Sequence, residues 1–415
     1  MCRNSSTLKG ADKMLVAKTM HGDRISLAMN RNQEHLRKLR KNEVFFCPEC
    51  QEEVILKIGK KRIPHFAHKK GTSCTESYER ESEYHLQGKV QLFKWLHTQG
   101  VEPVLEQYEQ TIAQRSDIGF VYNGRKYAIE YQCSPIPSDL FKKRTISYQK
   151  ANITPIWILG GKNIKRKGFS QASLSSFDYL FLRKTPSQHW SLPAFCPLTN
   201  DLIFMTHITP ISVKNIQTQF SVIKLSKAKL LDLLHPLDRH DFPLEDWRTE
   251  IRKWKNTAAF YGTPNNKFFQ ELYSSFMIPS LLPPAIGLPV IHAPFIETPS
   301  IQWQSYIIID MLKEEESVSI GQILHSFRTR LRNNMISLRE IPLNQNNYES
   351  AVKEYIELLV ATNIVQKKRG VRFKLIFPLS IAENQIQQDE MEREYYHKYG
   401  GIILESMRKH VSMDN

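Results

Sequence analysis

Apolar residues recur at three- and four-residue spacing over residues 79–98, and this pattern predicts an amphipathic helix. Its apolar stripe consists of Leu86, Val90, Phe93 and Leu96. The residues that follow have patterns typical of strands, over 104–110, 117–122 and 126–132. Between the last two stands Asn123-Gly124, the strongest short hairpin signal in the chain. We therefore expect a helix followed by three strands, with a tight turn joining the second and third.

A second helix and a fourth strand complete this region. Ser138 is of a residue type that favours helix N-caps, and it precedes a helical pattern over 139–151. The segment TPIWILG, residues 154–160, is mostly apolar, which indicates a buried strand. The order helix, three strands, helix, strand predicts a compact α/β domain over residues 79–167.

The segments on either side of this domain have patterns of their own. Residues 14–30 read as two short strands around His21-Gly22-Asp23, which predicts a hairpin within an N-terminal domain over 14–78. Residues 168–300 show no clear period. At their end, six prolines between residues 279 and 299 indicate a linker.

The C-terminal region, residues 301–415, is expected to be mostly helical. Helical patterns cover residues 301–314, 318–332 and 348–362. The segment after them, NIVQKKRGVRFKLIF, reads as a basic hairpin that turns near Gly370. Three helices with a β hairpin form a winged-helix module in other proteins, and this module is one interpretation of the region.

Composition and charge narrow the classes of function. The 415-residue chain is 41% hydrophobic, enough for two or three globular domains. Because no stretch approaches 18 apolar residues and the N-terminus lacks the apolar core of a signal peptide, we expect a cytosolic protein without membrane insertion.

Residues 1–200 hold 32 basic and 18 acidic residues, whereas residues 201–415 hold 25 basic and 24 acidic residues. The positive half predicts a polyanionic partner, nucleic acid before anionic membrane, although a solvated surface explains this charge equally well.

Three of the six cysteines and two histidines stand within 28 residues, which indicates a structural zinc site rather than a disulfide framework. Cys47 and Cys50 form a C-x2-C turn that can supply two thiolates. His68 and Cys74 are the expected remaining ligands, with His65 as the alternative fourth ligand. Four protein ligands leave no position for water, so we expect a zinc-ribbon-like structural site. Reduced cysteines beside surface histidines are the alternative.

Two carboxylates of the predicted hairpin should face each other. With Asn123-Gly124 as a two-residue loop, Asp117 lies opposite Glu130, with Cβ atoms roughly 4.5–5.5 Å apart. Because carboxylates at this distance repel each other, we expect a divalent cation held by both. Gln132 shares the face of Glu130 and is expected across from Arg115.

Polar residues of the two predicted helices can reach the same region. Glu81, His85 and Lys89 recur at four-residue spacing and share one flank of the first helix. Glu81 is a candidate metal ligand or water-orienting group. Arg144 and Tyr148, also four residues apart, are candidate contacts to a phosphate. Each of these residues taken singly is also explained as surface or core, so the opposed carboxylates are what favour a functional site.

Taken in order, these motifs resemble the competence protein CoiA family. The resemblance covers about residues 14–165 and is carried by Cys-x2-Cys, His-Phe-Ala-His, Cys74, Glu81-Ser82-x-x-His85-x-x-x-Lys89, Arg115-Ser-Asp117 and Ile129-Glu130-Tyr-Gln132. It implies a cytosolic bacterial protein, made during natural competence, that promotes recombination of incoming single-stranded DNA. It also implies a middle domain similar to the restriction-endonuclease-like PD-(D/E)xK nucleases.

On that resemblance, Asp117 and Glu130 match the metal-binding acidic pair. Gln132 departs from the pattern, since the nuclease motif has a lysine at this place. A lysine can stabilise the attacking hydroxide or the developing charge on phosphorus, whereas a neutral amide can only position water or substrate. The positive charge would then have to come from Lys89 or Arg144.

Three functions follow as hypotheses. The first is a metal-dependent endo- or exodeoxyribonuclease in which Mg2+ polarises the scissile phosphate, His85 or Glu81 orients the water, and Arg144 holds a flanking phosphate. Lys89, Arg115 and Tyr148 would be further contacts to DNA phosphates. The second is a non-catalytic DNA-binding recombination mediator that recognises single strands, ends or junctions. The third is an adaptor whose C-terminal half docks a recombinase of the RecA type or another competence protein.

Overall fold

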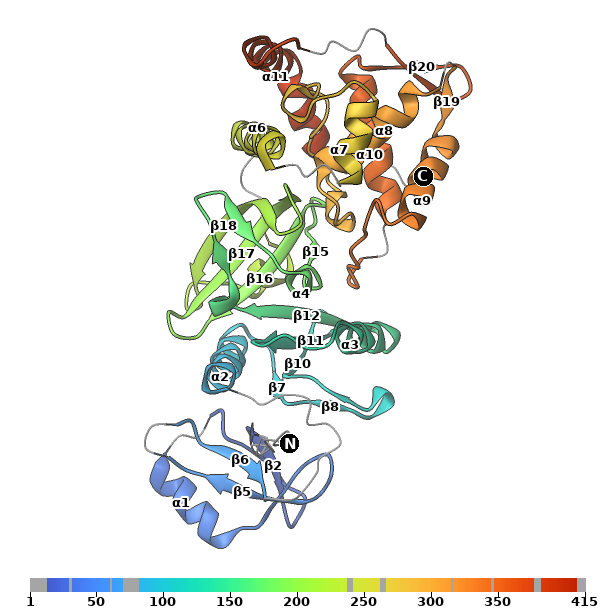
Figure 1. Ribbon diagram of the computed structural model, residues 1–415. Helices are drawn as coiled ribbons and strands as arrows, with labels where there is room; N and C mark the ends of the chain where they lie inside the picture. Colours follow the sequence, from blue (N-terminus) through green and yellow to red (C-terminus); the bar gives the residue numbers. More distant parts are fainter. Residues whose placement is uncertain are drawn as a thin grey trace, which may run out of the picture. The chain divides into compact units, whose positions relative to one another are not determined.

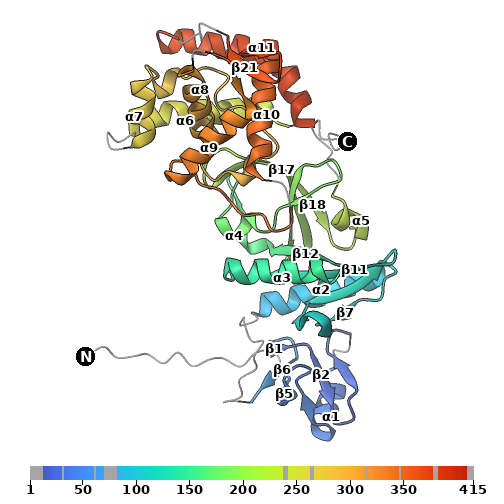
Figure 2. The same cartoon turned by 90° about the vertical axis from the view of Figure 1, so that its right-hand side faces the viewer.

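The computed structural model describes residues 13–29, 32–59, 62–69, 82–236, 242–261, 266–314, 316–344, 347–376 and 382–408. Figures 1 and 2 show the chain in two views, coloured along the sequence. The chain divides into two compact units. The first comprises Met1–Asn163, Pro193–Ile203 and Val222–Leu234, and the second comprises Ile164–Leu192, Phe204–Ser221 and His235–Asn415.

The N-terminal part of the first unit contains a six-stranded sheet in the order β1-β6-β5-β4-β2-β3. Its elements are β1 (Lys13–Met14), β2 (Val16–Thr19), β3 (Arg24–Ser26), α1 (Gln33–Asn42), β4 (Phe45–Phe46), β5 (Glu53–Lys57) and β6 (His65–His68). Strands β2 and β3 pair antiparallel with Lys18 opposite Arg24, so the predicted hairpin is confirmed. Gly22 in its turn has a φ of 86°, a value that favours glycine.

The α/β core of the first unit has the predicted elements, with two differences. They are α2 (Glu83–Thr98), β7 (Val104–Leu105), β8 (Tyr108–Glu109), η1 (Gln110–Ile112), β9 (Gln114–Arg115), β10 (Ile118–Tyr122), β11 (Arg125–Gln132), α3 (Ser138–Lys150), β12 (Ile153–Gly160) and η2 (Gly161–Asn163). The strand expected over 104–110 is interrupted, because Glu106 has a φ of 50°, which ends the extended backbone. Pro137, not Ser138, is the N-cap of α3.

Strands β10 and β11 pair in the register that the sequence predicts. Ile118 lies opposite Ile129 and Tyr122 opposite Arg125, around the tight turn Asn123-Gly124. Both turn residues have positive φ, 48° and 72°, as a type I′ turn requires. Strand β10 also pairs antiparallel with β7, and β11 pairs in parallel with β12. The strand order β7-β10-β11-β12-β16 therefore places the hairpin between β7 and β12.

Helices α2 and α3 cover opposite faces of this sheet, and Figure 1 shows both beside β10 to β12. Successive residues of a strand point to opposite faces. Tyr131 of β11 packs closely over Gly88 of α2, whereas Ala128 packs with Tyr148 of α3. Glu130 shares the face of Ala128 and therefore points toward α3.

The remaining elements belong to the second unit or extend into both units. They are β13 (Lys165–Arg166), β14 (Gln171–Ser173), α4 (Ser176–Tyr179), β15 (Arg183–Lys184), β16 (Trp190–Cys196), β17 (Asp201–Pro210), β18 (Asn215–Lys224), α5 (Leu230–Leu234), α6 (Leu244–Tyr261), α7 (Lys267–Ser274), η3 (Pro279–Leu281), η4 (Ala293–Phe295), α8 (Ser300–Leu312), β19 (Val318–Ser319), α9 (Ile320–Arg332), α10 (Tyr348–Ala361), β20 (Val365–Lys368), β21 (Arg372–Leu375) and α11 (Gln385–Arg408). In the second unit, β14 pairs antiparallel with both β13 and β18.

Residues 279–299, which the prolines indicated as a linker, are core residues of the second unit instead. Leu282 and Leu288 are fully buried. Nε1 of Trp247 donates a hydrogen bond of 2.9 Å to the carbonyl of Gly287. Because proline has no backbone N–H, an irregular segment rich in proline has fewer donors that need partners, so it can be buried. The prediction of a linker is therefore wrong.

The three predicted C-terminal helices are confirmed as α8, α9 and α10. The basic hairpin is also present, as β20 and β21 with Gly370 between them, and β19 adds a third strand in the order β19-β21-β20. The winged-helix interpretation of these elements stays a prediction. In the described ranges, we find no helix that combines the length and the apolar character needed to cross a membrane.

The contact between Gly88 and Tyr131 can be tested by Gly88→Ala. A Cβ atom at position 88 would lie 2.0 Å from a ring carbon of Tyr131, so the variant should be destabilised by about 1–3 kcal/mol. The measurement is the midpoint of thermal unfolding by circular dichroism. Gly401→Ala is the matched control, because Gly401 is also helical and has nothing within 4 Å of its Cβ position. Equal midpoints for Gly88→Ala and the wild type would contradict this packing.

Candidate active site and candidate metal centre

Asp117, immediately before β10, is surrounded by groups of α2 and β11. Its Oδ1 lies 3.2 Å from Nζ of Lys89 and its Oδ2 3.3 Å from Nε2 of His85. The backbone N–H of Tyr131 also donates to Oδ2, at 2.8 Å. Burial by itself raises the pKa of the Asp117 carboxyl, but Lys89 and His85 outweigh it and hold the pKa well below its ordinary value. Asp117 is therefore a carboxylate at neutral pH.

Glu130 lies in β11, and two residues of α3 donate hydrogen bonds to its carboxylate. The guanidinium of Arg144 and the hydroxyl of Tyr148 both donate to its Oε1. These two residues are four apart on α3, which brings them to the same face of the helix. Among the described residues, the other oxygen, Oε2, accepts no hydrogen bond.

The pKa of Glu130 is shifted in the direction opposite to that of Asp117. Burial raises the pKa of the Glu130 carboxyl. Arg144 opposes this shift and Asp117 adds to it, so that the pKa stays above its ordinary value. Two neighbouring carboxyls with shifts of opposite sign are a common feature of sites that carry out acid–base chemistry.

The two carboxylates have different cationic neighbours. The pairing of β10 with β11 begins at Ile118, and the Asp117 carboxylate accepts the Tyr131 N–H and lies beside Lys89 of α2. Lys89, which Asp117 shares with Glu106, and Arg144, beside Glu130, reduce the repulsion that the sequence led us to expect. In the described part of the chain, the pair does not join a third acidic or histidine side chain in a compact ligand group.

Glu106 is a member of this site that the sequence did not point to. Its Oε1 lies 2.8 Å from Nζ of Lys89, and both side chains are almost completely buried, at 2% and 1% exposure. Its oxygens also accept hydrogen bonds of 3.0 and 3.1 Å from the backbone N–H groups of Leu15 and Val16. Burial raises the pKa of Glu106, but Lys89 and Arg115 outweigh it and lower the pKa below its ordinary value. Glu106 therefore connects the N-terminal sheet to Lys89 and, through Lys89, to Asp117.

The other predicted site residues have different surroundings. Nε2 of Gln132 donates to the carbonyl of Ser134 at 2.7 Å. Arg115 is paired with Tyr108 in the separate β8–β9 sheet, so the expectation that it lies across from Gln132 is wrong. Its guanidinium forms an ion pair of 2.7 Å with Glu49.

Two residues expected to contact DNA phosphates are buried, and two other predicted site residues lie outside the described ranges. Lys89 and Tyr148, expected at DNA phosphates, are each 1% exposed and hold Asp117 and Glu130 instead. Glu81 and Cys74 lie outside the described residues.

The candidate metal centre is formed by Cys47, Cys50 and His68. Their ligand atoms all lie within 4.8 Å of one another, and they are the only such group in the described ranges. The antiparallel pairing of β5 with β6 places Val54 opposite His68, which returns the histidine to the cysteine turn. Nε2 of His68 is 3.3 Å from Sγ of Cys50.

The same group includes one of the two candidate histidines, His68, and has the chemistry to hold a cation. Nδ1 of His65 is 2.9 Å from the carbonyl oxygen of Ile63, and His65 is not part of the group. Burial raises the pKa of the Cys47 thiol, so the site favours the neutral thiol until a cation supplies positive charge. Two thiols and an imidazole at this separation are suitable ligands for a structural metal ion.

Comparison with known proteins agrees with this organisation. Three family models match: "Competence protein CoiA, N-terminal domain" over residues 28–77, "Competence protein CoiA, nuclease-like domain" over 81–238 and "Competence protein CoiA, C-terminal domain" over 242–381. The chain is also 30% identical over 359 residues to the competence protein CoiA of Bacillus subtilis (strain 168), across 85% of this chain and 95% of that protein. The chain belongs to the competence protein CoiA family.

This membership confirms the resemblance that the sequence motifs carried. The carboxylate site lies in the CoiA nuclease-like domain and the Cys47, Cys50, His68 group in the CoiA N-terminal domain. No solved structure matches this CoiA-family chain.

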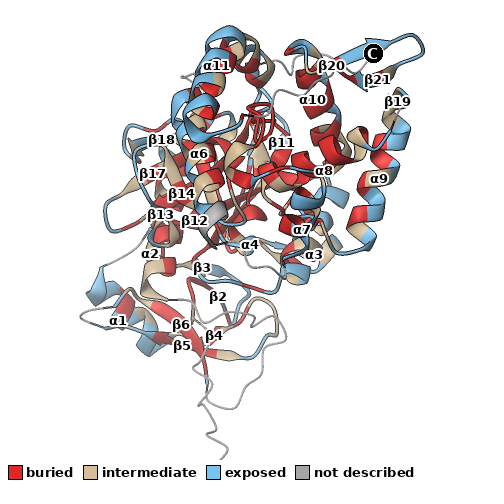
Figure 3. Cartoon of the chain, turned by 45° about the horizontal axis from the view of Figure 1, so that its top comes forward, coloured by how far each residue is buried: buried red, intermediate tan, exposed pale blue. Residues whose placement is uncertain are grey.

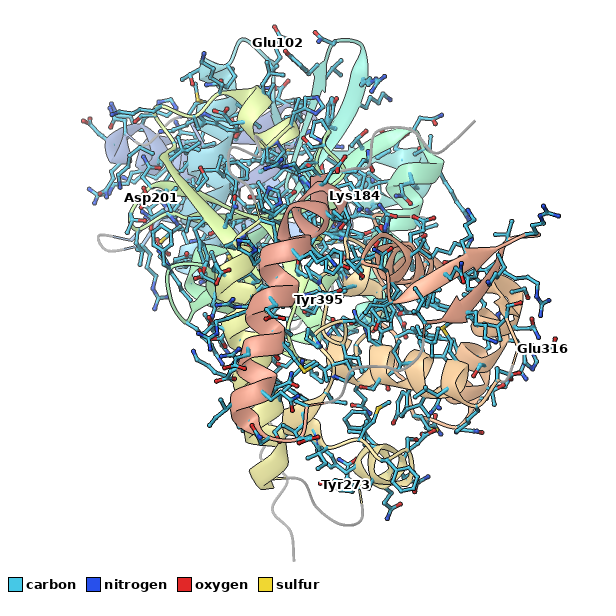
Figure 4. All side chains as sticks on the ribbon, turned by 90° about the horizontal axis from the view of Figure 1, so that it is seen from above. Glu102, Lys184, Asp201, Tyr273, Glu316 and Tyr395 are labelled. Carbon is cyan, nitrogen blue, oxygen red and sulfur yellow. The ribbon has the colours of Figure 1, made fainter. Side chains whose placement is uncertain are left out.

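The role of Glu106 can be tested by Glu106→Ala. The variant leaves buried Lys89 with one carboxylate fewer and two buried N–H groups without their acceptor, so unfolding should become easier by about 3–5 kcal/mol. The measurement is denaturant unfolding followed by tryptophan fluorescence. Glu102→Ala is the matched control, because Glu102 stands in the same segment and is exposed (Figure 4). Similar stability of both variants would show that Glu106 does not connect the two parts.

Proposed function

We propose that this CoiA-family protein acts on incoming DNA in natural transformation, as a divalent-metal-dependent deoxyribonuclease that hydrolyses phosphodiester bonds. The observation that carries the proposal is the buried pair of Asp117 and Glu130, with opposite pKa shifts and with Lys89 and Arg144 beside them. Substrates with single-stranded or branched segments fit the family's place in transformation. The positive N-terminal half favours such a polyanion.

The two carboxylates differ in how ready they are to hold a cation. Asp117, whose pKa is low, remains anionic and is suited to hold one. Glu130, whose pKa burial raises, would be stabilised as an anion by a cation bound beside it. His85, 3.3 Å from Asp117, is placed to orient the attacking water.

The donor set also fits a divalent cation. Oε2 of Glu130 has no protein hydrogen-bond donor among the described residues, so it is open to a ligand, and Asp117 supplies oxygen ligands on the α2 side. Mg2+ or Mn2+ held by these two residues would polarise the phosphate and lower the pKa of water. Lys89 and Arg144 would then supply the positive charge that the motif lysine supplies in other nucleases of this type.

A second function has its own supporting observation. The side chain of Gln132, which replaces that lysine, is tied to the Ser134 carbonyl, and both carboxylates already have protein cations. A site whose carboxylates are already paired with protein cations suits a DNA-binding recombination mediator that uses the nuclease-like domain to recognise strands, ends or junctions without cutting them. Metal-dependent cleavage distinguishes the two functions.

We further propose a structural Zn2+ in the N-terminal domain, held by Cys47, Cys50 and His68, with Cys74 as the fourth ligand. The compact Cys-Cys-His group supports this proposal. The ion pair between Arg115 and Glu49, which stands between the two cysteines, would join the zinc turn to the nuclease-like domain.

Cleavage can be tested with Asp117→Asn and Glu130→Gln. Each variant keeps the shape of the side chain and removes its negative charge, so Mg2+- or Mn2+-dependent cleavage should fall by about 10²–10³-fold while DNA binding in EDTA is retained. The measurement is cleavage of labelled single-stranded, duplex and branched DNA.

Asp139→Asn is the matched control for charge, since Asp139 lies on α3 with its side chain 96% exposed. It should cleave like the wild type. If the wild type binds these DNAs but cuts none of them with either metal, the nuclease proposal fails and the mediator is favoured.

The metal can be tested by elemental analysis of the purified chain. The wild type should contain about one zinc per chain, and Cys50→Ser should lose most of it and unfold at a lower temperature. Cys196→Ser is the control, because Cys196 is outside the Cys47, Cys50, His68 group and should retain the metal. Wild-type protein that is folded and free of zinc after growth with zinc would refute this site.

A further inference from the structure

The β20–β21 hairpin of the second unit is a basic, exposed element that the candidate active site does not use. We propose that it is a second nucleic-acid contact, which binds the phosphate backbone without reading the base sequence. Its binding residues are Lys367, Lys368 and Arg369, at the tip of the hairpin. This contact goes beyond the proposed nuclease, because it requires neither the carboxylates nor a metal ion.

The pairing of the two strands separates an apolar side from the charged tip. Val365, Phe373 and Leu375 are buried, at 1%, 5% and 4% exposure. Strand β20 contacts α10, and β21 contacts α8. Lys368 lies opposite Arg372, and the three residues between them form the loop. Figure 3 shows that this end of the hairpin is coloured as exposed.

The hairpin carries an excess of basic residues. Residues 365–376 include five basic and no acidic residues, and the rest of residues 201–415 holds 20 basic against 24 acidic residues. Lys367, Lys368 and Arg369 form no ion pair in the described part of the chain. Because like charges on neighbouring strand positions repel each other, a bound polyanion would stabilise this arrangement.

Hydrogen bonds from Arg372 fix the position of the hairpin. The guanidinium of Arg372 donates to Oγ of Ser317 at 3.0 Å and also to the Ser317 carbonyl. It therefore ties β21 to the segment that begins β19. Arg372 lies opposite Lys368 and pairs with Ser319, so this anchor holds the tip end of the hairpin. Glu316, labelled in Figure 4, is the acidic residue next to the anchor in the sequence.

The neighbouring helix explains why backbone binding is proposed rather than base reading. In other proteins with three helices and a wing, the helix before the wing is the one that enters the major groove. Here that helix, α10, carries Glu349, Glu354 and Glu357 against a single lysine, Lys353. An acidic helix is repelled by phosphates, so the basic hairpin is the part suited to DNA.

The test replaces all three tip residues by alanine, Lys367→Ala, Lys368→Ala and Arg369→Ala, in the full chain. Affinity for fluorescein-labelled single-stranded and duplex DNA is measured in EDTA by fluorescence anisotropy at several salt concentrations. Losing three phosphate contacts should lower the slope of log affinity against log salt by about 2–3 and weaken binding at least about 10-fold at low salt.

The matched control removes the same net charge elsewhere on the second unit, by Lys214→Ala, Lys267→Ala and Lys398→Ala. These three lysines are exposed, and the control should bind nearly like the wild type. If both triple variants lose the same affinity, binding follows net charge alone and the hairpin proposal is overturned, as it is if the hairpin variant binds like the wild type. Circular dichroism melting of both variants ensures that a loss is not caused by unfolding.

One further outcome separates this proposal from the nuclease. A wild type that never cuts DNA would remove the nuclease proposal, but a reduced slope in the hairpin variant would still support the second contact.

Discussion

The arrangement of the candidate active site depends on one buried ammonium group, that of Lys89. Removing a charge from water without a partner costs several kcal/mol, so Lys89 must be paired where it lies. It is paired twice, by Glu106 at 2.8 Å and by Asp117 at 3.2 Å. To supply the first partner, the backbone at Glu106 adopts a φ of 50°, which ends strand β7. The same pairing keeps Asp117 on the α2 side of the hairpin.

This pairing gives the two carboxylates different chemical properties. Asp117, beside Lys89 and His85, is held as an anion. Glu130, enclosed between β11 and α3, has a raised pKa despite its contact with Arg144. Two carboxylates in one fold can take separate roles when their surroundings shift their pKa values apart. Gln132 stands where the nuclease motif has a lysine, but its side chain is neutral. Any catalysis would therefore depend on the cations of α2 and α3, Lys89 and Arg144.

The N-terminal sheet is part of this electrostatic arrangement. Glu106 accepts hydrogen bonds from Leu15 and Val16, and Arg115 pairs with Glu49 in the cysteine turn. A metal ion that stabilises the cysteine turn would therefore also stabilise the surroundings of Lys89. The C-terminal hairpin has a different character, because its tip residues Lys367, Lys368 and Arg369 are exposed, as a surface for a polyanion requires.

The sequence by itself determined the order of elements in the core, the register around Asn123-Gly124, the C-terminal helices and the three described residues of the candidate metal centre. These features depend on short-range causes: periodicity, turn residues with positive φ, and the spacing of ligands. Only the tertiary structure decided that residues 279–299 are core, that Arg115 binds Glu49 and that Glu106 completes the site. The physical reason is that a buried charge or backbone group is satisfied by whatever lies nearest in space. For Glu106 that includes Leu15, 91 residues away in the sequence.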